Sequence, residues 1–178
     1  MALDDYNFIF YHPEIIRHIE RHFLGSGVTG SRFREDVFRG AREVIDFATS
    51  HIQGYCDQRI VVELDMPYIV GFDGLVHLRD LPTDVEVIQE RRDSGDCPVY
   101  VVTGISRKPT NHIVIIAGPL GNELHGFYSI YPGKYAPPVP ISEFRLRELG
   151  YTYDKLAKAL QDNIENAAFW NGHALIKD

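Results

Sequence analysis

The residues best suited to chemistry lie between Val99 and Pro140, where histidine, serine and tyrosine side chains accompany strand-like segments. Side chains alternate along a β-strand. Four side chains are therefore expected on one face of a strand: His125, Phe127, Ser129 and Tyr131. A strand beginning at His112 is expected to bring a second imidazole to the same rim. Such a set can supply a base, an acid and hydrogen-bond donors.

Three basic residues belong to the same stretch, namely Arg107, Lys108 and Lys134. Together with the one acidic residue Glu123, these three cations give the stretch a net charge of +2. The whole chain has a net charge of −7, so the rest of the chain carries −9. A locally positive segment in an acidic chain predicts an anion site. A chance arrangement is the alternative, because three cations are few. Tyr128, on the opposite strand face, is a further candidate for substrate contact.

A second group of histidines lies near the N-terminus. His18 and His22 are four residues apart, which is the spacing of a two-histidine metal site on a helix. The zinc-protease motif requires Glu directly after the first His, and Ile19 occupies that place. The pattern therefore indicates a solvated helix face, and neither a metal nor a cofactor is predicted.

The elements that must hold these residues follow from periodicity and turn signals. Helices are expected from His12 to Phe23, from Ser31 to Ile52 and from Tyr153 to Ala168. Strands are expected at these ranges: 59–64, 68–70, 75–78, 84–92, 98–103, 112–117 and 124–131. Turns are expected at 71–74 and 118–122, a polar loop at 105–111, a proline-rich crossing segment at 134–140, and a final strand or packed tail after Phe169.

This order of elements predicts an α+β fold, with a central antiparallel sheet flanked by N-terminal helices and a C-terminal helix. The strand at 112–117 is apolar enough to be buried on both faces. The 178 residues suit one domain. Its expected parts are a helical N-terminal part (1–55), an antiparallel sheet core (59–140) and a C-terminal helix and tail (141–178).

Composition limits the class of protein. No run approaches the roughly 18 apolar residues of a membrane helix, and the acidic start of the chain does not resemble a secretory signal. Two cysteines do not make a disulfide framework, so we expect reduced thiols and a cytoplasmic location. The net charge of −7 argues against a general nucleic-acid-coating protein. The oligomeric state stays open.

Three segments together resemble the core of the barnase/EndoU/colicin/RelE-like RNase toxins. They are Val99 to Gly104, His112 to Gly118 and Phe127 to Gly133. The matching element near the site of that superfamily is Ser129-Ile130-Tyr131-Pro132, a hydroxyl-aromatic-Pro pattern. The resemblance covers about residues 60 to 140 and leaves the first 55 residues unexplained.

The resemblance implies metal-independent cleavage of RNA, in which a base activates the ribose 2′-hydroxyl and an acid protonates the leaving oxygen. It assigns these roles to His125 and His112. Arg107 or Lys134 would bind the phosphate, and Ser129 and Tyr131 would position the substrate. We therefore expect His125, His112 and one of these cations to converge in a single concave site.

Two other functions remain open. In a non-catalytic protein-binding or regulatory domain, the aromatic rim and Pro137-Pro138 would form a partner surface. The N-terminal helices would offer a second surface for a protein partner. A small-molecule hydrolase or transferase using the same strand face is the third possibility.

Overall fold

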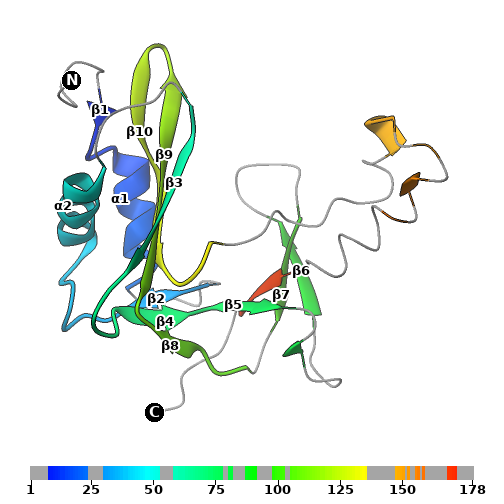
Figure 1. Ribbon diagram of the computed structural model, residues 1–178, viewed down its shortest axis with the longest axis horizontal. Helices are drawn as coiled ribbons and strands as arrows, with labels where there is room; N and C mark the ends of the chain where they lie inside the picture. The colour runs from blue at the N-terminus through cyan, green and yellow to red at the C-terminus, as the bar shows by residue number, and fades with distance from the viewer. Residues whose placement is uncertain are drawn as a thin grey trace.

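The computed structural model describes residues 8–23, 30–52, 58–77, 80–81, 87–91, 98–102, 105–135, 147–150, 152, 155–156, 158 and 168–171. Its elements in chain order are β1 (Phe8–Ile9), α1 (Pro13–Glu20), β2 (Arg32–Phe33), α2 (Ala41–His51), β3 (Ile60–Asp65), β4 (Gly71–Asp73), β5 (Leu75–His77), β6 (Val87–Arg91), β7 (Pro98–Val102), β8 (Lys108–Thr110), β9 (His112–Gly121), β10 (Leu124–Pro132) and β11 (Ala168–Asn171). These strands form three sheets (Figure 1). The fold therefore mixes α and β structure, with sheets of mainly antiparallel strands.

The largest sheet has the order β1-β10-β9-β3, with β9 paired on both edges. All residues of β9 from Ile113 to Gly118 are buried, as its apolar composition predicts. Ile113, Ile115 and Ala117 face the main core. Val114 and Ile116 belong to a smaller buried cluster on the other face. The expected two-sided burial of this strand is confirmed.

The hairpin of β9 and β10 is longer than its sequence suggests. The expected turn at 118–122 is wrong, because β9 continues to Gly121. The reversal takes place at Asn122 and Glu123, whose φ angles are 53° and 60°. Two successive positive φ angles are the geometry of a tight hairpin turn. The result is a long two-stranded arm (Figure 1).

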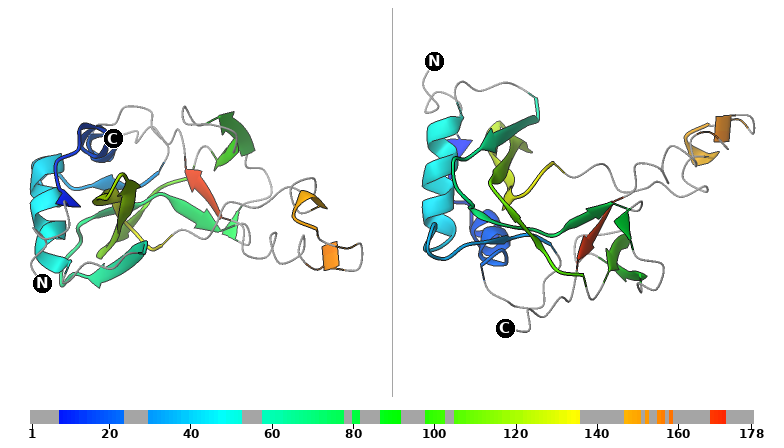
Figure 2. Two further views of the ribbon diagram at one scale, coloured as in Figure 1. Left: turned by 90° about the horizontal axis from the view of Figure 1, so that it is seen from above. Right: turned by 60° about the horizontal axis from the view of Figure 1, so that its bottom comes forward.

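Both described helices pack against this sheet (Figure 2). Pro13 opens α1, and the His12 ring accepts a hydrogen bond from the backbone N–H of Glu14 at 3.3 Å. The buried positions of α2 follow helical spacing: Ala41, Val44, Ile45 and Ala48. α2 lacks a side-chain cap at Gly40, but the Glu43 carboxylate accepts from the Arg39 N–H at 2.8 Å.

A continuous helix from Ser31 to Ile52 is not formed. Arg32–Phe33 is instead the short strand β2, and α2 starts only at Ala41. Tertiary contacts decide this, because the Phe33 N–H donates to the His22 carbonyl and the Arg34 N–H donates to the Val70 carbonyl, both at 2.9 Å. The N-terminal part is accordingly not purely helical, since it also contributes β1 to the largest sheet.

The second sheet, in the order β2-β4-β8, differs most from the sequence expectation. The expected turn at 71–74 contains strand β4, the expected strand at 68–70 is a connection, and the expected loop at 105–111 contains β8. Gly71 permits this packing. A Cβ on Gly71 would collide with the Arg32 carbonyl oxygen and would lie 2.8 Å from Pro132 Cβ.

The third sheet has the order β5-β11-β7-β6 (Figure 2). The strands expected at 75–78, 84–92 and 98–103 are present in it as β5, β6 and β7 within the described residues. β11 runs parallel to β7, and β1 runs parallel to β10, so the expectation of a single antiparallel sheet is wrong. The expected helix at 153–168 and the segment after Tyr135 lie largely outside the described residues, although Ala168 begins β11.

No helix in the described ranges combines the length and the apolar character needed to cross a membrane.

Replacing Gly71 tests the close approach of β2, β4 and β10. We expect Gly71→Ala to lower the free energy of unfolding by about 1–3 kcal/mol, because the added methyl meets backbone and proline atoms that cannot turn away. Urea unfolding followed by circular dichroism measures the loss.

Gly40→Ala is the matched control. A Cβ on Gly40 meets nothing within 4 Å, and its φ of 167° is extended backbone. We expect this variant to lose less than about 1 kcal/mol, mainly through a poorer helix cap. Equal losses in the two variants would contradict the close packing at Gly71.

Candidate functional site

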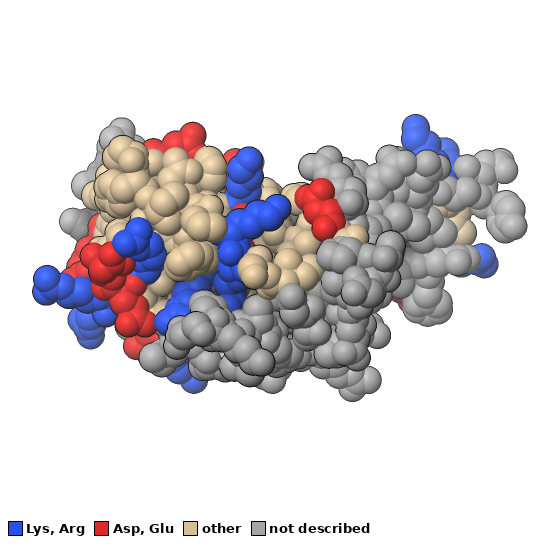
Figure 3. Space-filling model, turned by 90° about the horizontal axis from the view of Figure 1, so that it is seen from below, with Lys and Arg blue, Asp and Glu red and all other residues tan. Residues whose placement is uncertain are grey.

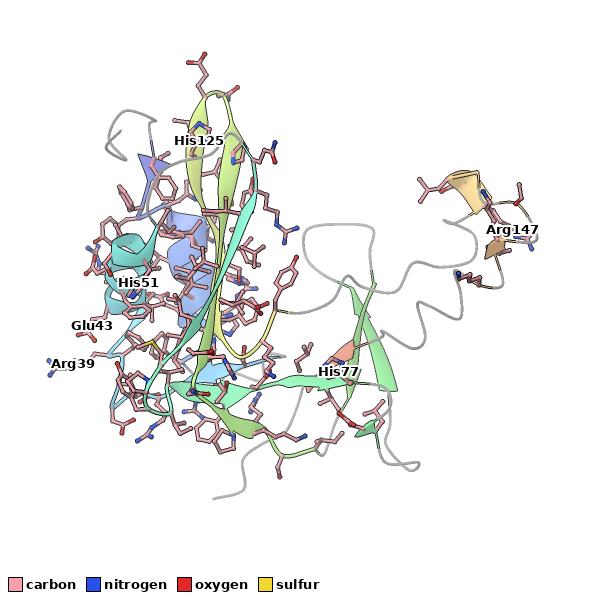
Figure 4. The ribbon with its side chains drawn as sticks, in the orientation of Figure 1. Arg39, Glu43, His51, His77, His125 and Arg147 are labelled. Carbon is pink, nitrogen blue, oxygen red and sulfur yellow. The ribbon has the colours of Figure 1, made fainter. Side chains whose placement is uncertain are left out.

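The two histidines proposed as an acid–base pair lie at opposite ends of the β9–β10 hairpin. His125 is opposite Pro119 beside the hairpin turn, whereas His112 is the first residue of β9. Pro119 is seven positions along the strand from His112, which corresponds to about 23 Å. Figure 4 shows His125 near the end of this arm. The structure therefore does not bring His125 and His112 together.

An irregularity in β10 separates the side chains that were expected on one face. Phe127 is paired with Ala117 and Ser129 with Ile116, so the additional residue Tyr128 is inserted between them. Phe127 consequently joins the main core, while Tyr131 joins the smaller cluster on the other face. The predicted shared face of His125, Phe127, Ser129 and Tyr131 is wrong because this bulge changes the alternation.

Ser129 meets a histidine from α1 instead. Its hydroxyl lies 2.9 Å from His18 Nε2, and both residues are half-buried. The His18 ring is 5.3 Å from the His22 ring, edge to face. The i, i+4 histidines therefore face the sheet, and the expected solvated helix face is wrong at these two positions.

His22 occupies an enclosed position behind this pair. Its Nδ1 lies 2.7 Å from the Ser31 carbonyl oxygen, to which it donates, and its ring stacks on Tyr131 at 6.2 Å. Some surface of the residue is exposed, but Nε2 is buried and has no hydrogen-bond partner. Burial, reinforced by the nearby His18, lowers the pKa of His22 to about 4. His22 is therefore neutral at physiological pH.

Two more candidates serve the packing of the fold. The Tyr128 hydroxyl donates to the Pro119 carbonyl across the hairpin. Arg107 Nε donates to the Gly30 carbonyl at 2.8 Å, just before β2. Partial burial, together with the charge of Arg32, lowers the pKa of Arg107. Arg107 thus helps to hold the chain that leads into β2.

A different group of titratable residues surrounds Asp73 at the end of β4. The Asp73 carboxylate accepts from the Leu75 N–H at 2.8 Å and from the Lys134 N–H at 3.4 Å. Partial burial raises the pKa of Asp73, while these hydrogen bonds and the nearby imidazoles of His77 and His112 oppose the rise. Both histidines therefore lie within electrostatic reach of one half-buried carboxylate.

His112 is held in place from a second side. Its Nδ1 forms an ion-pair contact with the Asp65 carboxylate, directly opposite on β3. Because a carboxylate accepts a hydrogen bond, this contact places the proton on Nδ1 and leaves Nε2 for proton exchange with a ligand. The Gly133 N–H also donates to the His112 carbonyl, at 2.9 Å.

Lysine residues complete the group. Lys108 is directly opposite Asp73 in the pairing of β8 with β4, so their side chains share one face of that sheet. Lys134 follows Gly133, at which a Cβ would lie 2.7 Å from Asp73 Oδ1. We call these six residues the Asp73 site: Asp65, Asp73, His77, Lys108, His112 and Lys134.

Basic side chains are exposed on the underside of the molecule, with acidic side chains also present on that face. Seen from below, Lys and Arg side chains form a band over the region of the β2-β4-β8 sheet (Figure 3). Arg32 of β2 lies close enough to Arg107 to lower the pKa of Arg107. Lys108, which comes from the segment with a net charge of +2, is opposite Asp73 in this sheet.

The structure brings together His112, Lys108 and Lys134 from the predicted set and adds three residues that the sequence did not reveal. Asp73 was hidden because Gly71 to Gly74 has the composition of a turn. His77 and Asp65 lie on short strands whose partners are remote in sequence. The available signal for Asp73 was a carboxylate in a short segment that begins with Gly71 and ends with Gly74. Glycines permit close approach of another backbone segment.

Among the residues that the structure describes, no group of three or more His, Cys, Asp or Glu side chains is arranged to hold a metal ion. Comparisons with protein-family models, with curated proteins and with solved structures found no match to this chain.

The enclosed ring of His22 makes stability depend on pH. The folded-state pKa of about 4 lies below the ordinary histidine pKa of 6.5, so the unfolded chain binds the proton more readily. We expect the free energy of unfolding to fall as the pH drops from about 6.5 to about 4, with a contribution on the order of 3 kcal/mol. Urea unfolding across this pH range measures the dependence.

His22→Gln should flatten this dependence, because the amide can still donate to Ser31 but does not titrate. His51→Gln is the control, since His51 is exposed at the end of α2. A pH dependence that survives in His22→Gln and disappears in His51→Gln would contradict the assignment.

Proposed function

We propose that the protein is a metal-independent endoribonuclease that cleaves RNA by attack of the ribose 2′-hydroxyl. The observation that carries the proposal is the His112 ring, held by Asp65, within electrostatic reach of the half-buried Asp73 carboxylate that the His77 imidazole also influences. His112 and His77 are the acid–base groups in this proposal, and Lys108 and Lys134 bind the phosphate. His77 thus replaces His125 in the role inferred from the sequence.

The chemistry requires one proton acceptor and one proton donor. His112, oriented by Asp65, removes the proton from the 2′-hydroxyl, and the resulting oxygen attacks the adjacent phosphorus. The bond from phosphorus to the 5′-oxygen breaks, and protonated His77 gives its proton to that oxygen. The products are a 2′,3′-cyclic phosphate and a free 5′-hydroxyl.

The charges around Asp73 suit this reaction. A phosphorane carries more negative charge than the ground-state phosphodiester, and lysine ammonium groups stabilise it. Lys108 is paired with Asp73 across β8 and β4, and the backbone N–H of Lys134 donates to the Asp73 carboxylate, so both lysines start from positions next to the site.

The sequence resemblance supports the same reaction. The stretch from about residue 60 to 140 that resembles the RNase toxins contains all six residues of the Asp73 site. Ser129 and Tyr131, the positioning residues implied by that resemblance, pack against His18 and His22. In this proposal they support β10, whose last residue precedes Gly133 and Lys134.

Incubation of the full chain with labelled single-stranded RNA in the presence of a chelator tests the proposal. We expect cleavage that leaves 2′,3′-cyclic phosphate ends, and no cleavage of a substrate lacking the 2′-hydroxyl. His112→Ala and His77→Ala should each lower the rate by about 100-fold or more, because each removes a proton-transfer group.

His125→Ala is the matched control and should cleave at the native rate, because His125 lies near the far end of the hairpin. Thermal unfolding of every variant shows whether it is folded. Cleavage of the 2′-deoxy substrate, or a native rate in His112→Ala, would overturn the mechanism. RNA left intact by the native chain would favour the non-catalytic binding domain.

A further inference from the structure

The connection between β3 and β4 exposes an aromatic side chain three residues after Asp65 of the Asp73 site. Tyr68 is 50 % exposed and its neighbour Ile69 is 37 % exposed. Large side chains of this kind lose solvent contact when a ligand covers them. Tyr68 forms part of a five-residue connection, 66–70, that starts directly after Asp65.

Backbone hydrogen bonds hold both ends of this connection. The Met66 N–H donates to the Asn111 carbonyl at 2.8 Å, and the Asn111 side-chain amide donates to the Met66 carbonyl at 2.9 Å. At the other end, the Val70 N–H donates to the Thr110 carbonyl, and the Val70 carbonyl accepts from the Arg34 N–H, both at 2.9 Å. Tyr68 is therefore presented from a connection with fixed ends.

These anchors are the residues next to His112. Thr110 and Asn111 directly precede it, and Asp65, which contacts its ring, directly precedes the connection. Tyr68 is thus three residues from the carboxylate that orients His112. The connection that carries Tyr68 is hydrogen-bonded to the two residues before His112, so Tyr68 and His112 belong to the same end of β9.

We propose that Tyr68 is a stacking platform for an unpaired base, so that the ligand of this surface is single-stranded RNA. The cleavage role of this RNA rests on the proposed function, whereas its binding does not. An unpaired base offers a free π-face to a tyrosine ring, while bases inside a duplex are already stacked. The basic band over the β2-β4-β8 sheet supplies cations for the backbone of the same strand (Figure 3).

Fluorescence anisotropy with a 2′-O-methyl oligonucleotide measures binding without cleavage. We expect the native chain to bind the single strand more tightly than a duplex of the same sequence. Tyr68→Ala should weaken single-strand binding by about 10-fold or more, and Tyr68→Trp should preserve it, because indole also stacks on a base.

Tyr11→Ala is the matched control. Tyr11 is also exposed, but its hydroxyl contacts Asp46 of α2 and its ring lies under Arg42. We expect native binding from this variant. Equal binding of single strand and duplex, or native binding by Tyr68→Ala, would overturn the stacking role.

The binding and cleavage experiments separate the two proposals. Tyr68-dependent binding without cleavage by the native chain supports the stacking surface and overturns the ribonuclease. If Tyr68→Ala binds RNA with native affinity and cleaves it at the native rate, the ribonuclease is supported and the stacking surface is overturned.

Discussion

The rest of the structure depends on the register of β9 between β3 and β10. Residues 113–118 are buried on both faces, so a slip of one residue would exchange the two faces of the strand. The same register sets His112 opposite Asp65 and Tyr131 opposite Val114. Apolar burial in the middle of the strand thus determines where its polar end lies.

Asp73 lies on β4 of the β2-β4-β8 sheet and links that sheet to the β1-β10-β9-β3 sheet. Its carboxylate receives backbone donors from β5 and from the residue two positions after β10, and burial opposes its ionisation. Desolvation outweighs these favourable contacts in its pKa. A residue that served only to cap a turn could meet the same donors at the surface, where ionisation is less costly. Its half-buried position is therefore the reason to connect Asp73 with chemistry.

The bulge at Tyr128 accounts for the failure of the strand-face prediction. Perfect alternation would have kept His125 and Phe127 on the face of Ser129 and Tyr131, and the inserted residue separates the first pair from the second. Because α1 packs against β10, the Ser129 hydroxyl contacts His18 and the Tyr131 ring stacks on His22. Periodicity within β10 could not reveal this, because a bulge depends on pairing with β9. The presence of Lys108 and Lys134 in a segment with a net charge of +2 could be seen in the sequence, but their approach to Asp73 could not.

By itself, the sequence determined the elements with strong local signals. The start of α1 at Pro13, the two-sided burial of β9 and the strand from Leu124 follow from residue type and spacing over a few positions. Only the tertiary structure decided that Arg32–Phe33 is a strand and that His77 and His112 lie within electrostatic reach of Asp73. These features depend on pairing between segments remote in sequence. The energy of such pairing comes from burial and hydrogen bonds that no local pattern contains.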